Sequence, residues 1–382
     1  MKLSIDRILT THVGSLPRSQ NVVDQLVAKQ KGELADQQAF DDVMRDGVSD
    51  VVARQVEAGV DIVSDGETSK IAYSTYVTDR LTGFEGDSPR KPNKDVAPYP
   101  EFRQKMALVT GDQPMPRAVC VGPIAIKDRE QLRKDLENMA AARDASGPAD
   151  VFLPAASPGV ISCFQPNEYY PTHEDYIGAL ADAMREEYEA IVGAGFVLQV
   201  DCPDLAMAFH TTSQDLSERE FLRRVDLQIE ALNHALENVP AESVRMHICW
   251  GNYEGPHNFD IPVEKIMPAI LRAKPTGIQF EASNPRHAHE WVAWRDAKVP
   301  DDKVLIPGVL DSTSNFVEHP ELVAQRIEQF AAIVGRERVL AGSDCGFGTF
   351  AGYSKMDPEI VYVKLRAQAE GAAIASKRLW AR

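Results

Sequence analysis

Short apolar runs recur along the chain, and each ends in a polar or Gly/Pro-rich cluster. Eight such runs cover residues 8–15, 60–67, 150–157, 196–203, 244–251, 277–283, 303–311 and 338–346. Mostly apolar runs of this length are typical of strands that are buried on both faces, as in a parallel sheet. The pattern therefore predicts eight parallel strands.

The segments between these runs have the apolar spacing of helices. In residues 176–193 the apolar side chains recur every three or four positions and fall on one stripe, and a glycine stands at the end of the segment. Residues 320–334 and 40–58 show the same spacing and are each followed by a glycine. A strand followed by a helix, repeated eight times, predicts an α/β fold, namely a (β/α)8 TIM barrel that spans residues 1–382 as one domain.

One region after the second predicted strand breaks this alternation. Residues 84–148 contain many prolines and charged residues around an apolar run at 117–126. We predict a long insertion here, in which the apolar run allows a hairpin. Two interpretations remain open: a solvated surface excursion, or a lid or dimer element, since loops of this length are often functional.

Composition and charge bear on the partners of the chain. Apolar residues make up 44% and charged residues 26% of the sequence, which is ordinary for a globular protein. The net charge of −16 argues against nucleic acid as a partner, because phosphate binding requires clustered Lys and Arg. We therefore expect small-molecule ligands. The tail at 353–382 has a helical pattern and could close the barrel or join a second copy in a homo-oligomer.

The sequence also bears on location and on redox state. Residues 1–19 lack the apolar core of a signal peptide, and no stretch approaches the ~20 apolar residues of a membrane span. We expect no membrane contact and a cytoplasmic location. The five cysteines lie at wide, irregular intervals that do not resemble a disulfide framework, so we expect free thiols or metal ligands.

Chemically reactive side chains gather where the predicted strands end. In a barrel of this kind the active site lies at the carboxyl ends of the strands. The residues at these ends are His12, Ser15, Asp65, Glu67, Asp201, Asp204, His247, Cys249, Glu281, Asp311, Asp344 and Cys345. Nearly all candidate metal ligands are thus predicted at one rim.

Two of these residues stand two positions apart in the fifth run. His247 and Cys249 therefore point to the same face of a strand. Glu281 and Cys345 end the sixth and eighth runs, so four ligands can meet at the barrel mouth. Two thiolates with an imidazole and a carboxylate favour Zn2+ over magnesium or calcium. A buried, inert thiol is the alternative for each cysteine.

Several motifs at these strand ends are similar to those of a known family. They are THVGSLPR at 11–18, VSDGE at 63–67, QVDCPDL at 199–205, HICWGN at 247–252, FEAS at 280–283 and GSDCG at 342–346. In these motifs the chain resembles the catalytic C-terminal domain of cobalamin-independent methionine synthase and its single-domain relatives, which are zinc-dependent thiol alkyltransferases. The resemblance covers nearly the whole chain and implies a barrel with a His, Cys, Glu, Cys zinc site.

The resemblance also assigns residues to the substrate. Ser15, Glu67 and Asp201 fall where the family holds the amino-acid part of homocysteine. The two carboxylates suit an ammonium group, and Ser15 could donate a hydrogen bond to a carboxylate. The structural alternatives are a helix cap or an ion pair for each carboxylate, and turn formation for Ser15.

The reaction implied by the resemblance is transfer of a methyl group to a thiol acceptor, homocysteine or a similar aminothiol. The alkyl donor stays open between a folate, a cobamide and a sulfonium. Methionine synthases carry a D-x-H-S pattern after the seventh strand, whose histidine handles protons near the methyl group. Here the stretch reads DSTSN, with Thr313 at that place. Asp204, Asp311 and Thr313 are candidates for supporting positions around the site.

The short relatives also include epoxyalkane:coenzyme M transferases, which add a thiol to an epoxide. This alternative requires a general acid for the emerging alkoxide, and His12, His210 and His257 are the candidates. A sulfonate on the thiol would need cationic contacts, for which Arg18 and Lys70 are nearest.

Two further alternatives belong to other classes of protein. The zinc could be structural in a non-catalytic binding module, but such sites usually take their ligands from short local segments rather than from distant strand ends. The chain could also be a decarboxylase of the uroporphyrinogen type, which shares the barrel without a metal.

Overall fold

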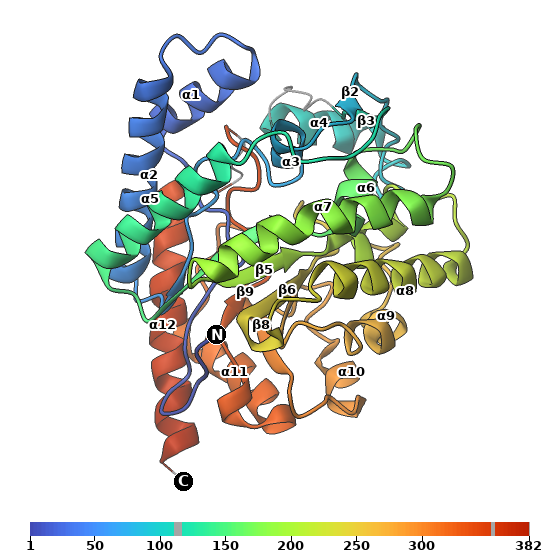
Figure 1. Cartoon of the computed structure of the whole chain (residues 1–382). Coiled ribbons are helices and arrows are strands. Elements are labelled where there is room, and N and C mark those ends of the chain that lie inside the picture. The colour runs from blue at the N-terminus through green and yellow to red at the C-terminus, as the bar shows by residue number, and fades with distance from the viewer. Residues whose placement is uncertain (111–116, 353–355, 382) are drawn as a thin grey trace.

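The computed structural model describes residues 1–110, 117–352 and 356–381. Its centre is a curled parallel sheet with helices outside it, which is a TIM-barrel-like α/β arrangement (Figure 1). In the described part of the chain the sheet has the strand order β1-β4-β5-β6-β7-β8-β9. The strands are β1 (Ile62–Val63), β4 (Asp150–Ala156), β5 (Val197–Asp201), β6 (Val244–Ile248), β7 (Gly277–Phe280), β8 (Val304–Leu310) and β9 (Gly342–Ser343).

Seven of the eight predicted strand runs contain these strands, and the prediction of a regular strand at 8–15 is wrong. This segment makes one parallel bridge, between Thr10 and Ala341, and the oxygen of Thr10 accepts from the backbone N–H of Ile62. It therefore runs between β9 and β1 without forming a ladder. The physical reason is local, since the N–H of Thr10 donates to the carboxylate of Asp61 instead of to a strand carbonyl.

Helices cover the outer face of the sheet, as the apolar spacing predicts. The three helical segments singled out in the sequence form α2 (Gln37–Glu57), α7 (His173–Gly193) and α11 (Pro320–Val334), and their cap residues include Asp36 and Thr172. The other helices are α1 (Gln20–Gln30), α3 (Tyr76–Arg80), α4 (Pro100–Thr110), α5 (Glu130–Ser146), α6 (Pro158–Phe164), α8 (Glu218–Ala235), α9 (Val263–Ile270), α10 (Trp291–Asp296) and α12 (Pro358–Trp380), with 3-10 turns η1 (Pro203–Leu205), η2 (Met207–Phe209), η3 (Ala241–Ser243) and η4 (Arg336–Arg338).

The region predicted as an insertion, 84–148, has two parts, and its residues 111–116 lie outside the described part of the chain. Its first part contains α4 and a two-stranded antiparallel sheet of β2 (Phe84–Glu85) and β3 (Val119–Cys120). The apolar run at 117–126 thus pairs with a distant segment rather than forming a tight hairpin. Its second part is α5, which packs on α2 and leads directly into β4, so this part belongs to the outer helical layer.

The two faces of the sheet carry different side chains. Met246, Ile248 and Phe280 are buried against the helices, as expected for strands that are covered on the outside. On the inner face, Arg245 is fully buried, lies over the ring of Phe152, and donates hydrogen bonds across the barrel. The inner face of the sheet therefore carries polar side chains already in the layer that precedes the carboxyl ends of the strands.

Among the described residues, none of the helices is both long enough and apolar enough to cross a bilayer.

Candidate active site

The period-two alternation of the strands carries the reactive side chains to the inner face of the sheet. Gln199 pairs with Arg245 in the β5–β6 register, and two positions further along the same strands Asp201 pairs with His247. Gln199 accepts from Arg245 and donates to the carboxylate of Asp201 over 2.8 Å. The buried polar layer therefore holds Asp201 in place beside His247 at the carboxyl end.

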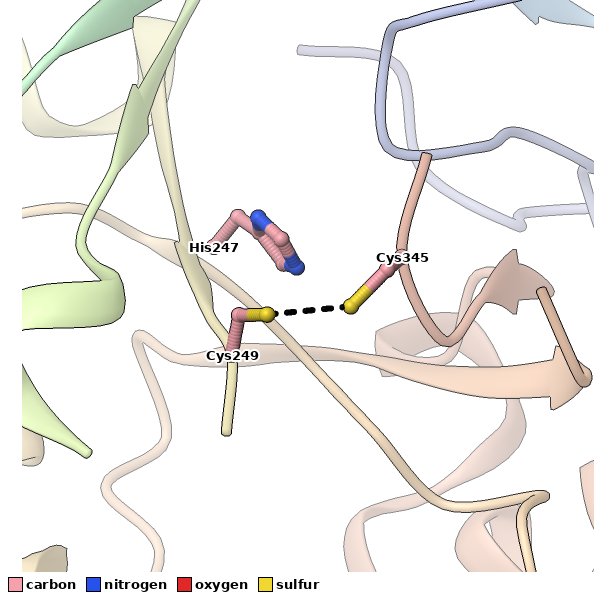
Figure 2. Close-up of side chains that lie close together, drawn as sticks. All are labelled: His247, Cys249 and Cys345. Carbon is pink, nitrogen blue, oxygen red and sulfur yellow. Dashed lines mark hydrogen bonds between the residues drawn. The ribbon is translucent and has the colours of Figure 1, made fainter. Parts of the chain in front are cut away.

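Three of the four predicted zinc ligands converge. The ligand atoms of His247, Cys249 and Cys345 all lie within 4.8 Å of one another, and all three residues are buried (Figure 2). The two sulfur atoms are 3.1 Å apart. Two sulfurs bound to one zinc at ~2.3 Å can be at most about 4.6 Å apart, so this spacing allows a shared ion.

The chemistry of these groups fits a zinc ion. The Nδ1 atom of His247 lies 3.4 Å from Oδ1 of Asp201, whereas its buried Nε2 atom makes no hydrogen bond. Burial and the neighbouring Cys249 raise the pKa of the Cys345 thiol well above its usual range. Two buried thiols of this kind lose their protons together only when a cation compensates the charge.

Glu281, the fourth predicted ligand, lies next to Cys345 but outside the three-residue cluster. Its Oε1 atom is 3.5 Å from the Cys345 sulfur and accepts from the N–H of Trp250, and its Oε2 atom accepts from the side chain of Asn284. Both oxygens are therefore already hydrogen-bonded. The carboxylate of Asp344 accepts from three successive backbone N–H groups at 282–284 and so fixes the turn that carries Glu281.

A cavity of about 490 Å3 opens above the cluster. Its wall contains the two sulfurs and His247, and it also contains the three residues predicted to hold the substrate, Ser15, Glu67 and Asp201. Other parts of the wall come from Pro89, Arg90, Lys91, Asn93, Val96, Met106 and Arg117. The first part of the 84–148 region thus shares in enclosing the site.

Glu67 stands out among the carboxylates of the cavity. Its backbone has a φ of 55°, a left-handed conformation that is uncommon for a residue other than glycine. Its Oε2 atom is buried and makes no hydrogen bond. Burial raises the pKa of the Glu67 carboxyl to about 8, with Lys70 opposing the shift and Asp201 adding to it. A buried carboxylate without a partner is suited to bind a cationic group of a ligand.

Arg18 and Lys70, the candidate sulfonate contacts, are used by the protein itself. Arg18 donates to the backbone oxygens of Glu67 and Gly348, and Lys70 donates to the oxygen of Pro154 over 2.7 Å. Neither residue lines the cavity. They support the turn that holds Glu67.

His12 and Asp204 do not reach the cavity wall. Nε2 of His12 bonds Gln55 over 2.7 Å, and its Nδ1 accepts from the N–H of Gly14, so both ring nitrogens are satisfied. Burial lowers the pKa of His12 to about 3, which keeps the ring neutral. Asp204 accepts from the hydroxyl of Ser157, which in turn caps α6. Both positions have structural partners.

The remaining predicted positions lie in loops around the rim. His210 and His257 both belong to a buried polar group around Asp260, behind the cavity wall. Asp311 accepts from both the N–H and the hydroxyl of Thr313, and Thr313 lines a separate pocket. Thr313 occupies the position at which the resemblance leads us to expect a histidine, and it does not line the main cavity.

Several residues of the wall were not singled out in the sequence. Tyr73 and Tyr253 both line the cavity, and Asn252 donates to the backbone oxygen of Gly346 and to the hydroxyl of Thr349. Asn252 and Tyr253 directly follow Cys249 and Trp250, so the motif that points to the ligand could have indicated them. Tyr73 has no such signal.

Gly346 is required by the close approach of Ser15. A Cβ atom at position 346 would lie 2.0 Å from the Ser15 hydroxyl oxygen, so any other residue there would force this hydroxyl out of its present position. The final glycine of the GSDCG motif thus allows Ser15 to reach the cavity next to Cys345. The motif has a steric as well as a chemical basis.

Comparison with known proteins places this cavity in a family context. The sequence profile described as "Cobalamin-independent synthase, Catalytic domain" matches residues 8–358. The chain belongs to this family. Its relatives include a methionine synthase of Saccharolobus solfataricus, 26% identical over 384 aligned positions that cover 97% of this chain and 95% of the relative. A methionine synthase of Sulfolobus acidocaldarius is 25% identical over 340 positions, covering 88% and 85% of the two chains.

Solved structures show the same fold. The B12-independent methionine synthase from Shewanella sp. W3-18-1, in complex with selenomethionine, aligns with a TM-score of 0.72 at 20% identity, covering 98% of this chain and 100% of the other. A protein described as a putative vitamin-B12-independent methionine synthase from Listeria monocytogenes aligns with a TM-score of 0.64 at 18% identity, covering 98% and 99%. The barrel-like arrangement thus recurs along the full length of both proteins.

Proposed function

We propose that the protein is a zinc-dependent methyltransferase that methylates an aminothiol such as homocysteine. The observation that carries this proposal is one cavity that brings two thiols and an imidazole together with two carboxylates. The first group suits a metal that binds sulfur, and the second suits a substrate that carries an ammonium group. A ligand with a thiol at one end and an amine at the other matches both.

His247, Cys249 and Cys345 would hold the zinc ion, with Glu281 as the fourth ligand. When bound there, zinc would favour the thiolate form of the substrate at neutral pH and so supply a nucleophile. Glu281 lies at the edge of the cluster and already has other hydrogen-bond partners, so it is the ligand that we expect an incoming thiol to replace.

The protein residues above the cluster orient the substrate. Glu67 and Asp201 would accept hydrogen bonds from its ammonium group, and the Ser15 hydroxyl would donate to its carboxylate. This arrangement fixes the distance between the amine and the sulfur of the acceptor. It would hold the sulfur toward the open part of the cavity, where the methyl donor has to enter.

The relatives support the same reaction. The two similar archaeal proteins are named methionine synthases, and a protein of the same fold is known in complex with selenomethionine, a close analogue of the expected product. The methyl donor is a folate, a cobamide or a sulfonium.

The epoxide alternative is not favoured. The histidines that were candidates to protonate an alkoxide, His12, His210 and His257, do not line the cavity, and each already has hydrogen-bonding or ion-pair partners. The candidate sulfonate contacts are also occupied by backbone carbonyls. A purely structural zinc is equally disfavoured, because the cluster faces a cavity large enough for a ligand.

The proposal is tested by a panel of acceptors and donors. The purified protein is incubated with homocysteine or coenzyme M against methylfolate, methylcobalamin, a methyl sulfonium and epoxypropane, and the products are identified by mass. We expect a methylated aminothiol with at least one methyl donor. Turnover of epoxypropane without turnover of any methyl donor would overturn the proposal.

A further inference from the structure

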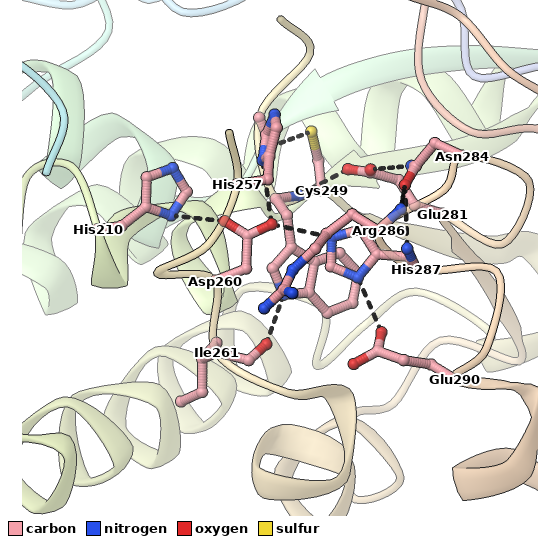
Figure 3. Close-up of polar contacts among 12 residues, drawn as sticks. His210, Cys249, His257, Asp260, Ile261, Glu281, Asn284, Arg286, His287 and Glu290 are labelled. Carbon is pink, nitrogen blue, oxygen red and sulfur yellow. Dashed lines mark hydrogen bonds and ion pairs between the residues drawn. The ribbon is translucent and has the colours of Figure 1, made fainter. Parts of the chain in front are cut away.

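A second group of potential metal ligands lies behind the wall of the cavity. Side-chain atoms of His210, His257 and Asp260 all lie within 4.8 Å of one another (Figure 3). His210 is fully buried, and the side chain of Asp260 is 1% exposed. His210 follows η2, whereas the other two residues lie in the loop that connects β6 with α9. The group shares no ligand residue with the cysteine cluster.

Tyr253 fixes the position of one hydrogen on each histidine ring. Nε2 of His257 lies 2.9 Å from the backbone oxygen of Tyr253, which can only accept, so this nitrogen carries a hydrogen. The Tyr253 hydroxyl lies 2.5 Å from Oδ2 of Asp95 and donates its single hydrogen there. Nε2 of His210, 3.2 Å from the same hydroxyl oxygen, is then the donor to that oxygen.

Nδ1 of His210 consequently faces the carboxylate of Asp260 with a lone pair, 3.2 Å from Oδ1. Nδ1 of His257 forms a hydrogen bond to the other carboxylate oxygen, Oδ2, over 3.0 Å, and a bound ion would take the place of that hydrogen. The His210 nitrogen and the Asp260 Oδ1 atom make no hydrogen bond with each other or with any other described group. Two buried acceptors that face each other are unfavourable unless a cation lies between them.

His287 shows how a histidine contacts Asp260 when a second ring proton, rather than a metal ion, supplies the positive charge. Its Nε2 and Nδ1 atoms form hydrogen bonds to Asp260 and Glu290, over 3.0 and 2.9 Å, so this ring can donate from both nitrogens. His210 has no such geometry toward Asp260. The 3.2 Å between Nδ1 of His210 and Oδ1 of Asp260, which make no hydrogen bond, instead matches neighbouring ligands of an ion with bonds of about 2.0–2.2 Å.

The surroundings also follow the pattern of metal-binding histidines. Such residues usually donate their other ring N–H to a carbonyl or another polar group, and ligating carboxylates are themselves hydrogen-bonded. His257 and His210 donate to the two oxygens of Tyr253, and Asp260 accepts from His287. Every outer contact expected for this type of site is therefore present.

We propose that His210, His257 and Asp260 bind a second divalent ion of the zinc class, which is distinct from the ion expected at the cysteine cluster. Two imidazole nitrogens and one carboxylate suit such an ion. The ion would join the 250–260 loop to the turn after η2. Because Tyr253 lies between this site and the cavity, the ion would position part of the cavity wall without contacting the substrate.

The test counts metal ions per chain and assigns each one to a site. The full-length protein, loaded with zinc and freed of excess metal, is expected to hold about two ions. The variants His210→Gln and Asp260→Asn should hold one, and so should Cys249→Ser. The variant His234→Gln is the matched control, because His234 is an exposed histidine paired with Asp182, and it should keep both ions. A wild-type protein that saturates at one ion, or a second ion that persists in His210→Gln, would overturn the proposal.

Cobalt(II) distinguishes the two sites even if a variant fails to fold. Titration of the metal-free wild-type protein should give one equivalent with a thiolate-to-cobalt absorption band and a second equivalent without it. Loss of the thiolate band alone would count against the proposed function, whereas loss of the second equivalent alone would count against the site at Asp260. An endpoint after one thiolate-type equivalent would show that His210 and His257 form a hydrogen-bonded network only.

Discussion

The two groups of histidine-containing ligands differ in what surrounds them. His247 with Cys249 and Cys345 lines the cavity, and its ligands come from strand ends that the sheet register fixes. The group around Asp260 lines no part of the cavity, and its ligands come from loops. Both are buried and both have geometry suited to an ion. If both groups bind ions as we propose, access to a ligand, rather than the presence of metal-binding side chains, would separate the reactive centre from the structural one.

The donor atoms of the two groups also differ. Thiolates retain electron density on a bound ion and suit the exchange of one sulfur for another. Two imidazoles and a carboxylate also occur in catalytic zinc sites, so the group around Asp260 is distinguished by its position outside the cavity wall rather than by its donor atoms. We therefore expect substitutions in the cysteine cluster to affect turnover more than substitutions around Asp260.

Replacing a ligand of the cysteine cluster should have the largest effect. Cys249→Ser is expected to lose one zinc ion and more than about 100-fold in methyl transfer, because even partners of metal ligands contribute 10–100-fold. The far-ultraviolet circular dichroism should stay unchanged. His257→Gln, which affects the group around Asp260, should retain measurable turnover. Equal losses in the two variants would remove the distinction between the sites.

Replacing Glu67 tests whether the cavity wall binds the amine of the acceptor in addition to the binding of its thiol at the cysteine cluster. Glu67→Gln keeps the shape but removes the charge that would face an ammonium group, so kcat/KM for homocysteine should fall about 10- to 100-fold. The same variant should use 4-mercaptobutanoate, which lacks the amine, as well as the wild type does. A comparable loss with both thiols would show that Glu67 does not contact the amine.

The pH dependence of acceptor binding should follow the same residue. Burial raises the pKa of Glu67 to about 8, so the carboxyl is neutral below this pH and charged above it. Binding of an ammonium group requires the charged form, so the affinity for homocysteine should fall up to about tenfold per pH unit below 8. Titration calorimetry at several pH values measures this slope. A slope that is unchanged in Glu67→Gln would assign it to another group.

The smallest effect is expected at Thr313. Its hydroxyl donates to Asp311 over 2.8 Å, and the residue lies outside the main cavity. Thr313→Ala should lower the free energy of unfolding by about 1 kcal/mol and change turnover less than about threefold. Chemical denaturation and steady-state assays measure the two quantities. A tenfold or larger loss of turnover would place this position at the reaction after all.

The sequence was sufficient for those parts of the site that depend on strand periodicity. The spacing of His247 and Cys249 predicts one face, and the register then places Asp201 beside His247. The strand at 8–15 could not be predicted correctly, because a side-chain contact from Asp61 replaces the ladder. The helix at 130–146 was hidden within a region rich in charge and proline, although it packs in the outer layer.

The group around Asp260 shows a second reason why sequence patterns could not predict every contact. His257 and Asp260 stand in a loop without periodicity, and His287 is 27 residues further along the chain. Their contacts depend on how two loops fold around Trp250, whose ring packs at a tilt against that of His287, with 4.4 Å between the ring centroids. Such a network has no pattern in sequence, even though each histidine is visible there.

The zinc environment during substrate binding tests the central claim most directly. X-ray absorption at the zinc edge, recorded on the Asp260→Asn variant to exclude the second site, should show two sulfur ligands without substrate. It should show three after homocysteine is added, because the substrate thiol is expected to replace Glu281 or a water at the ion. An unchanged sulfur count in protein that turns the substrate over would contradict the account.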